Sequence, residues 1–156
     1  MKLSNQKKRN YWQILFFKWF SFYESKLRKL KVRARRNKVH NIDTRVIDST
    51  KPIKKLYGKA DRVLIDAPCS GLGVLRRNPD SKWKLQPEFL DNIKKVQQDI
   101  LQQYSKMVKH GGKLVYATCS VLPSENQNQI AEFLASESGK DFKLVKDNKV
   151  LAHTSG

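Results

Sequence analysis

The sequence has few cysteines, few acidic residues and no long apolar run, and each shortage excludes a class of protein. Its 156 residues include only two cysteines, Cys69 and Cys119, fifty positions apart. Two such residues do not make a disulfide framework, so we expect reduced thiols and a cytoplasmic location. No stretch of about eighteen apolar residues is present, which excludes a membrane-spanning helix. The length suits one domain with a modest core.

Acidic residues are scarcest in the first part of the chain. Residues 1–60 hold 18 Lys and Arg against three Asp and Glu, a net charge of +15, whereas residues 61–156 have a net charge of +3. Such asymmetry favours a polyanionic partner, most simply a nucleic acid. A solvated basic helix without any partner would give the same count, and this alternative stays open.

The apolar spacing predicts helices and strands in alternation. Residues 23–39 have the three- and four-residue spacing of a helix whose Lys and Arg side chains face outward. Residues 41–48 and 59–66 are expected to be strands. The second of these contains the continuous apolar run VLI, which is typical of a parallel strand covered on both faces.

A longer helix is expected to follow, with Pro87 in its first turn and with Gly111 and Gly112 ending it. Its apolar side chains recur at spacings of three and four. The remaining expected elements are a strand over 113–118, a helix that begins near a capping box of Ser124 and Gln127, and a further strand over 141–145. This order is typical of an open α/β sheet with parallel strands.

Both cysteines follow apolar strands at the same edge of this expected sheet. Ligands of open α/β sheets bind outside the carboxyl ends of the strands, so Asp66, Cys69 and Cys119 are expected to converge in one cleft. A thiolate is a strong nucleophile toward an electron-poor carbon, and the expected helix after Cys119 would favour the thiolate. Asp66 ends a strand expected to be buried, so its carboxylate needs a partner, which a ligand could supply. The alternative is that both cysteines are small apolar fillers.

Other chemistries lack the residues that they need. A cysteine protease requires a positioned histidine, and His40, His110 and His153 lie in no such motif. Neither cysteine has a second ligand two to five residues away, so no metal site is expected. The GLG sequence at 71–73 does not by itself make a dinucleotide-binding loop.

Two longer motifs are specific. DAPCSGLGVLRRNPDSKW at 66–83 and YATCSVLPSEN at 116–126 resemble two signature motifs of the RsmB/Sun (Fmu, NOP/NSUN-type) family. Members of this family are RNA cytosine-5 methyltransferases that depend on S-adenosylmethionine. The resemblance runs from about Glu24 to Gly156. It implies an α/β fold with a Rossmann-like class I methyltransferase sheet, S-adenosylmethionine as the cofactor, and RNA, by analogy small-subunit ribosomal RNA, as the substrate.

The resemblance also implies roles for individual residues. Cys119 would attack carbon 6 of the target cytosine, and Cys69 would help eliminate the enzyme from the methylated base. Asp66 would lie beside the cofactor and the cytosine edge, and Asp48 would contact the adenine end of the cofactor. Apart from these roles, a group of basic residues inside the first motif is a candidate for contacts with the RNA near the cleft, and plain surface solvation is the alternative. These basic residues are Arg76, Arg77 and Lys82.

The match ends near Glu24. Family members carry, ahead of that position, a first strand, a glycine-rich cofactor loop and a second strand that ends in an acid. This chain has FFKWFSFYESKL there, and its first twenty or so residues are not expected to form a good strand. We therefore expect residues 1–22 to be a non-family segment and residues 23–156 to be a partial catalytic domain, without the first strands and the last strand.

This departure leaves two other interpretations of the function. One is a catalytically inactive, truncated fragment that at most binds RNA through its basic N-terminal half. The other treats YWQILFFKWF as an amphipathic anchor that lies on a membrane surface.

Overall fold

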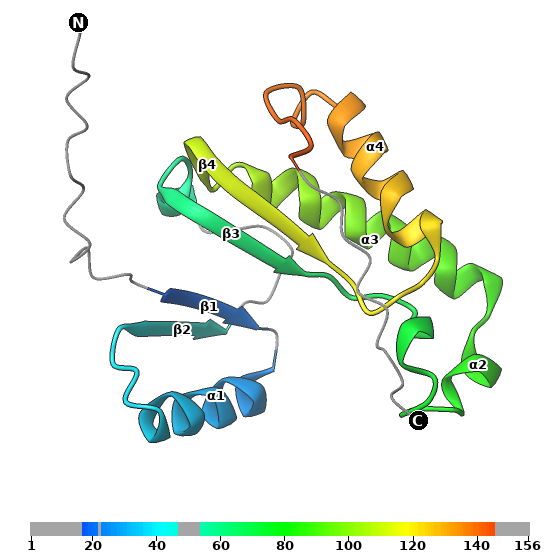
Figure 1. The fold of residues 1–156 in the computed structure, drawn as a ribbon, viewed down its shortest axis with the longest axis horizontal. Helices are drawn as coiled ribbons and strands as arrows, with labels where there is room; N and C mark the ends of the chain where they lie inside the picture. The colour runs from blue at the N-terminus through cyan, green and yellow to red at the C-terminus, as the bar shows by residue number, and fades with distance from the viewer. Residues whose placement is uncertain (1–16, 22, 47–53, 146–156) are drawn as a thin grey trace, which may run out of the picture. The chain divides into compact units, whose positions relative to one another are not determined.

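The computed structural model of the chain describes residues 17–21, 23–46 and 54–145 (Figure 1). The chain divides into two compact units, residues 1–49 and residues 50–156.

The described part of the first unit is a strand, a helix and a second strand. The strands β1 (Phe17–Ser21) and β2 (Ile42–Val46) pair in parallel, and the helix α1 (Glu24–Arg36) connects them. Leu27 and Ala34, two helical turns apart, are the buried side chains of α1. The helix predicted over residues 23–39 is confirmed, as is the strand predicted after it.

The strand β1 corrects one expectation. The first twenty residues were not expected to contain a good strand, yet the backbone of Phe17–Ser21 pairs with all five residues of β2. The backbone pairing comes from a parallel strand–helix–strand crossover, which tertiary context can impose on a sequence of mixed propensity.

The second unit contains a longer parallel pair. The strands β3 (Ala60–Asp66) and β4 (Val108–Ala117) are joined through the helix α3 (Pro87–Ser105), and the helix α4 (Gln127–Ala135) follows β4. Four short helical segments lie in the connections. They are η1 (Lys54–Leu56), η2 (Leu72–Val74), α2 (Ser81–Lys84) and η3 (Pro123–Glu125). The predicted α/β alternation is confirmed.

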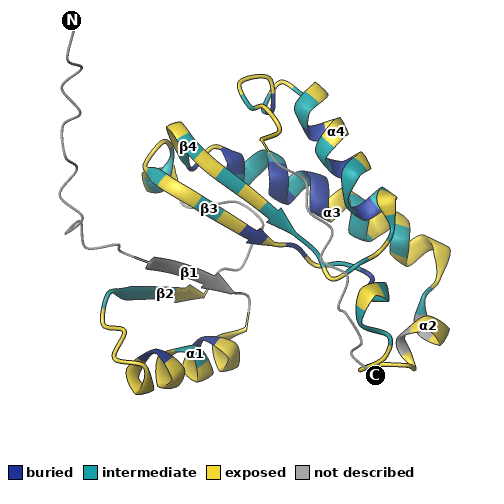
Figure 2. Cartoon of the chain, in the orientation of Figure 1, coloured by how far each residue is buried: buried dark blue, intermediate teal, exposed yellow. Residues whose placement is uncertain are grey.

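The core of this unit lies between the two-stranded sheet and the helices α3 and α4 (Figures 1 and 2). Its buried members are Ile65, Ala67, Ile100, Leu101 and Phe133. They come from one strand and its loop and from both helices, so one contiguous core fixes the position of the β3 end against α3 and α4.

The other face of β3 and β4 is exposed within this unit. Leu64 and Val115 pair in register, and their side chains are 62% and 51% exposed, whereas the neighbouring Ile65 is 5% exposed. The expectation that β3 is covered on both faces is therefore wrong for the described part of this unit. Helices pack on one face only, so the continuous apolar run alternates between buried and exposed positions.

The end of α3 and the start of β4 differ from the prediction. The helix ends at Ser105, and Val108 already pairs with Ala60 in the sheet. Four residues then bulge out before Lys113 pairs with Arg62. Gly111 has a φ of +73°, in the left-handed region that favours glycine. The two glycines thus shape a bulge inside β4 and do not end the helix.

Two further expectations near the C-terminal end are wrong. No side chain caps the N-terminus of α4, and Pro123–Glu125 forms a 3-10 turn that delays the helix to Gln127. The backbone carbonyl of Ser124 instead accepts a hydrogen bond from Gln129 Nε2 at 3.1 Å. Residues 141–145 form no strand, because no described strand lies beside them to pair with.

Candidate functional site

The two cysteines follow the carboxyl ends of β3 and β4. Asp66 pairs with Ala117 at the last position of the ladder, and Ala67 N donates to Ala117 O at 2.9 Å just beyond it. The segments that follow β3 and β4 therefore leave the sheet side by side and in the same direction (Figure 1). This is the edge where open α/β folds bind their ligands.

The structure brings the two thiols together. The Sγ atoms of Cys69 and Cys119 are 3.1 Å apart, and Cys119 N donates a hydrogen bond to Cys69 Sγ at 3.3 Å. Both cysteines are free; Cys119 is exposed and Cys69 is partly buried. The predicted convergence of the two cysteines is confirmed, and the roles of the two residues stay predictions.

A buried carboxylate lies behind the thiols. The side chain of Glu125 is fully buried, yet it accepts hydrogen bonds from Ser70 N at 2.8 Å, Ser70 Oγ at 2.5 Å and Gln97 Nε2 at 3.0 Å. Gln97, also fully buried, donates at the same time to Pro68 O at 2.8 Å. The serine hydroxyls that follow the two cysteines, Ser70 Oγ and Ser120 Oγ, are 3.1 Å apart.

The loop after Cys119 is ordered by an amide. Asn126 Nδ2 donates to the carbonyls of Ser120 at 2.9 Å and of Leu122 at 3.0 Å, and Thr118 Oγ1 donates to Asn126 Oδ1 at 2.5 Å. Tyr116 OH donates to the Glu125 carbonyl at 3.0 Å. Hydrogen bonds within the second motif therefore connect the end of β4 to the start of α4.

Close backbone contact explains the glycines of the first motif. Gly73 N donates to Cys119 O at 2.8 Å, and a Cβ atom at Gly73 would lie 2.7 Å from that oxygen. Gly71 has a φ of +74°, which starts the tight turn of η2. The GLG sequence thus lets one cysteine loop pass against the backbone of the other.

Sequence reasoning did not select the residues of this network. Glu125, Ser70 and Asn126 lie inside the two quoted motifs, but a carboxylate in a turn gives no sign of complete burial. Gln97 was missed as well, because α3 was predicted from its apolar side chains, and a polar residue among them was not expected to be buried. The only available signal was that both cysteines are followed directly by serine.

Burial and hydrogen bonding shift the pKa values of three side chains, those of Cys69, Glu125 and Tyr116. Burial, together with the hydrogen bond to Cys119, raises the pKa of Cys69 to about 11. Burial alone would raise the pKa of Glu125, but hydrogen bonds from Ser120 and Ser70 outweigh it and hold the pKa below its ordinary value. Burial beside the Glu125 carboxylate raises the pKa of Tyr116. Cys69 therefore keeps its proton at neutral pH, whereas Glu125 is ionised.

Two acids, Asp66 and Asp48, are predicted to contact the cofactor, and only Asp66 lies in the described residues. Asp66 is the last residue of β3 and is exposed, so the argument that a buried carboxylate needs a partner is wrong. The alternation along β3 turns Asp66 to the face that bears the exposed Leu64. Asp48 lies outside the described residues.

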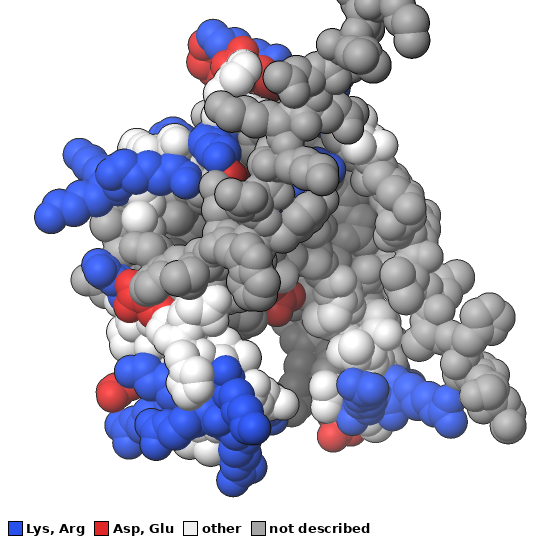
Figure 3. All heavy atoms as spheres, turned by 60° about the vertical axis from the view of Figure 1, so that its left-hand side comes forward, with Lys and Arg blue, Asp and Glu red and all other residues white. Residues whose placement is uncertain are grey.

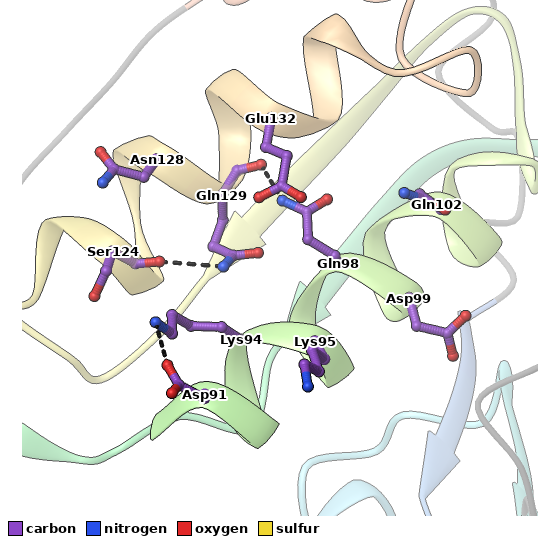
Figure 4. Close-up of a pocket in the computed structure, with 10 residues that line it drawn as sticks. All are labelled: Asp91, Lys94, Lys95, Gln98, Asp99, Gln102, Ser124, Asn128, Gln129 and Glu132. Carbon is purple, nitrogen blue, oxygen red and sulfur yellow. Dashed lines mark hydrogen bonds and ion pairs between the residues drawn. The ribbon is translucent and has the colours of Figure 1, made fainter. Parts of the chain in front are cut away.

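A groove of about 680 Å³ lies elsewhere in the unit, between α3 and α4 (Figure 4). Its floor is held by amides: Gln98 Nε2 donates to Gln129 O at 2.8 Å, and Gln129 donates in turn to Ser124 O. Lys94 and Asp91 form an ion pair at 2.7 Å on one rim. The hydrogen bond from Gln98 joins the two helices, and neither cysteine lines the groove, so the groove is a region of helix packing rather than a catalytic cleft.

Within residues 17–21, 23–46 and 54–145, no group of three or more His, Cys, Asp or Glu side chains could hold a metal ion. None of the helices in these ranges is both long and apolar enough to cross a membrane.

The raised pKa of Cys69 predicts slow alkylation. At pH 8 about one Cys69 side chain in a thousand carries the thiolate, against roughly a quarter for a free thiol, so iodoacetamide should modify Cys69 about 10²-fold more slowly than free cysteine. Mass spectrometry after short pulses would measure the rate, which should rise about tenfold per pH unit up to about pH 11. The urea-unfolded chain is the control. A plateau below pH 9 would contradict the shift.

Comparisons with known proteins agree on one family. The family described as "16S rRNA methyltransferase RsmB/F" matches residues 21–154. Ribosomal RNA small subunit methyltransferase B of Yersinia enterocolitica is 41% identical over 130 residues, which are 83% of this chain and 30% of the relative. The protein of that name from Yersinia pseudotuberculosis (strain IP 31758) is 53% identical over 74 residues, 47% of this chain and 17% of the relative.

Two solved structures share the fold. The crystal structure of PH0851 has a TM-score of 0.72 at 30% identity. The matched region covers 76% of this chain and 27% of the PH0851 chain. NSun6 from Pyrococcus horikoshii, solved with the S-adenosylmethionine analogue SFG, has a TM-score of 0.63 at 27% identity over 76% of this chain and 30% of its own. The chain spans less than a third of the length of these relatives.

Proposed function

The chain belongs to the RsmB/F family of 16S rRNA methyltransferases, and on this premise we propose that its two cysteines carry out S-adenosylmethionine-dependent methylation of carbon 5 of a cytosine in ribosomal RNA. The observation that carries the proposal is the 3.1 Å approach of Cys69 Sγ to Cys119 Sγ at the carboxyl ends of two parallel strands. Two free thiols so close, at the ligand-binding edge of an α/β sheet, suit a reaction that both forms and breaks a covalent bond to a base.

Cys119 is the better placed nucleophile. Its side chain is exposed, so a base can reach the sulfur, whereas Cys69 is partly buried behind it. Carbon 5 of cytosine is a weak nucleophile until a sulfur atom adds to carbon 6 and makes carbon 5 enamine-like. Bound S-adenosylmethionine supplies the methyl group that carbon 5 takes. The target base must be unstacked to expose carbon 6, which single-stranded or looped RNA permits.

Cys69 is suited to the release step. Burial is the main cause of its raised pKa, and the hydrogen bond and the charge of Cys119 add to it. These last two causes disappear once Cys119 is bonded to carbon 6. The Cys69 thiol then ionises more readily, at the stage when a proton must leave carbon 5 and the bond between sulfur and carbon 6 must break.

Asp66 fits a cofactor contact at this edge. Its carboxylate is exposed at the end of β3, three residues before Cys69, and it can accept hydrogen bonds from a ligand without first losing a buried partner. We assign Asp66 to the cofactor and the cytosine edge. The assignment of Asp48 to the adenine end remains a prediction from the family resemblance.

The basic residues would hold the RNA backbone. Most Lys and Arg side chains of α1 are exposed, and Figure 3 shows groups of Lys and Arg side chains on the surface. In the unit that contains the cysteines, Arg76 and Arg77 are exposed, and Lys82 lies 4.7 Å from the ring centre of the exposed Trp83. Cations beside an exposed indole suit a single strand, whose bases stack on aromatic rings and whose phosphates need positive charge.

The test is methyl transfer by the 156-residue chain itself. We expect radiolabel from S-adenosylmethionine to enter small-subunit ribosomal RNA, and nuclease digestion to release it as 5-methylcytidine. Label in another nucleoside, or none, would overturn the proposal. In the second case, RNA binding without transfer would support the alternative function, a non-catalytic RNA-binding chain.

The same RNA reports on the basic residues. Each neutralised phosphate contributes about −0.7 to the slope of log affinity against log salt on single strands. Six such contacts would give a slope of about −4, and charge-neutral variants of α1 should flatten it. A slope near zero would contradict phosphate binding by this surface.

A further inference from the structure

The relative position of the two thiols depends on two loops that leave the sheet after its last paired residues. Cys69 lies in the loop between β3 and η2, and Cys119 in the loop between β4 and η3. No disulfide joins the cysteines. Thiols in two independent loops would drift apart unless some group fixed one loop to the other.

Glu125 is a buried group that spans the two loops, which also meet through the hydrogen bond from Gly73 N to Cys119 O. It belongs to the η3 turn of the second loop, and its carboxylate accepts hydrogen bonds from both the backbone and the hydroxyl of Ser70, the residue next to Cys69. Gln97 of α3 adds a third hydrogen bond, and its amide also holds the carbonyl of Pro68, on the other side of Cys69. The backbone on both sides of Cys69 is therefore fixed to one carboxylate.

The burial of Glu125 argues that this arrangement is more than a surface contact. The side chain has no exposed area, and an ionised carboxylate in such a place is stable only while its oxygens are hydrogen-bonded. The hydrogen bonds from Ser70 and Gln97 come from the first cysteine loop and from α3, and Tyr116 holds the Glu125 backbone against β4. The carboxylate thus ties the first cysteine loop and α3 to the η3 turn of the second loop.

We propose that Glu125 is a positioning residue: its carboxylate holds the loop of Cys69 at a fixed distance from Cys119 and so sets the separation of the two sulfur atoms. The separation of the two sulfur atoms is a property of this chain alone. Its consequence for turnover rests on the proposed function, because only a reaction that uses both sulfurs requires their separation to be fixed.

Oxidation of the thiol pair measures the sulfur separation without RNA or cofactor. Diamide takes two electrons and two protons from the two thiols and becomes a hydrazine, while Cys69 and Cys119 form a disulfide. The rate depends on how often the sulfurs meet. We expect Glu125→Gln to slow disulfide formation by about tenfold or more. Ser70→Ala, which removes only the hydroxyl donor, should slow it by a smaller factor. Glu132→Gln, which removes an exposed carboxylate on α4, should leave the rate unchanged.

The direction of the expected change in oxidation rate distinguishes a changed sulfur separation from a changed fraction of thiolate. Removing a negative charge near the thiols favours the thiolate and would accelerate oxidation, so a slower rate must come from a changed position. A core variant with reduced stability, Phe133→Leu, controls for general loosening of the unit and should oxidise at the parental rate.

Two results would overturn the proposal. One is a parental rate of oxidation in Glu125→Gln; the other is an equal slowing in Phe133→Leu. If Glu125→Gln fails to fold, Ser70→Ala decides in the same way. Methyl transfer by each variant is measured separately. Slower oxidation in a chain whose parent transfers no methyl group would support the positioning role and reject the proposed function.

Discussion

A Cys119→Ala chain is expected to form no covalent adduct with RNA that carries 5-fluorocytosine, whereas the parental chain should form one in the presence of S-adenosylmethionine. Fluorine at carbon 5 blocks the proton loss that release requires, so the protein remains bonded to carbon 6. We expect the sulfur of Cys119 to reach that carbon because it is exposed, whereas Cys69 is partly buried and keeps its proton at neutral pH. A denaturing gel with labelled RNA measures the adduct.

Cys69→Ala is the matched control, because it removes a thiol 3.1 Å from the first. This variant should still form the adduct, and on ordinary cytosine RNA it should accumulate a bonded complex, because release loses a proton-transfer group worth about 10²–10⁴-fold in rate. An adduct in Cys119→Ala that disappears in Cys69→Ala would exchange the two roles. If neither variant nor the parent is trapped, the proposed chemistry itself is wrong.

The meeting of the two cysteines was predictable because it follows from topology. Parallel strands joined by a helix end at the same edge, so residues that follow each strand by two or three positions must be neighbours there. That argument needs only strand positions, which apolar runs locate well. It does not depend on where either helix begins or ends.

Glu125 was not predictable by the same means. Its burial depends on donors from Ser70 and Gln97, which lie 55 and 28 residues away in the sequence, and no periodicity reports such contacts. The bulge in β4 was missed for a related reason. Glycines after an apolar helix are a common end signal, and only the pairing of Val108 with Ala60 overrides it.

The exposure of Asp66 shows how an argument from one strand can fail. A continuous apolar run predicted cover on both faces, and the carboxylate was then expected to need a partner inside the protein. In the described part of this unit, helices pack on one face of the sheet, so the exposed side of β3 carries Leu64 and Asp66 alike. Burial of a strand depends on its neighbours, which its own sequence does not contain.

Gly73→Ala is expected to lower the rate of adduct formation about 10- to 100-fold, although it adds a single methyl group. The new Cβ would lie 2.7 Å from Cys119 O and 3.2 Å from its carbonyl carbon, and these are backbone atoms that cannot rotate away. The loops must separate, and the hydrogen bond from Gly73 N to Cys119 O must lengthen or break. Overpacking of this kind costs about 1–3 kcal/mol, and each 1.4 kcal/mol on the reacting geometry is about tenfold in rate.

Gly58→Ala separates this effect from a general loss of stability. Gly58 has a φ of +64° with open space around its Cα, so alanine there adds backbone strain of about 1–2 kcal/mol without touching either cysteine loop. Both variants should unfold at lower temperature than the parent, but only Gly73→Ala should slow adduct formation and diamide oxidation together. An unchanged adduct rate in Gly73→Ala would mean that the contact of Gly73 with Cys119 O does not fix the nucleophile. Equal slowing in Gly58→Ala would assign the effect to stability, since that residue lies beside Lys106, at the opposite end of the strands.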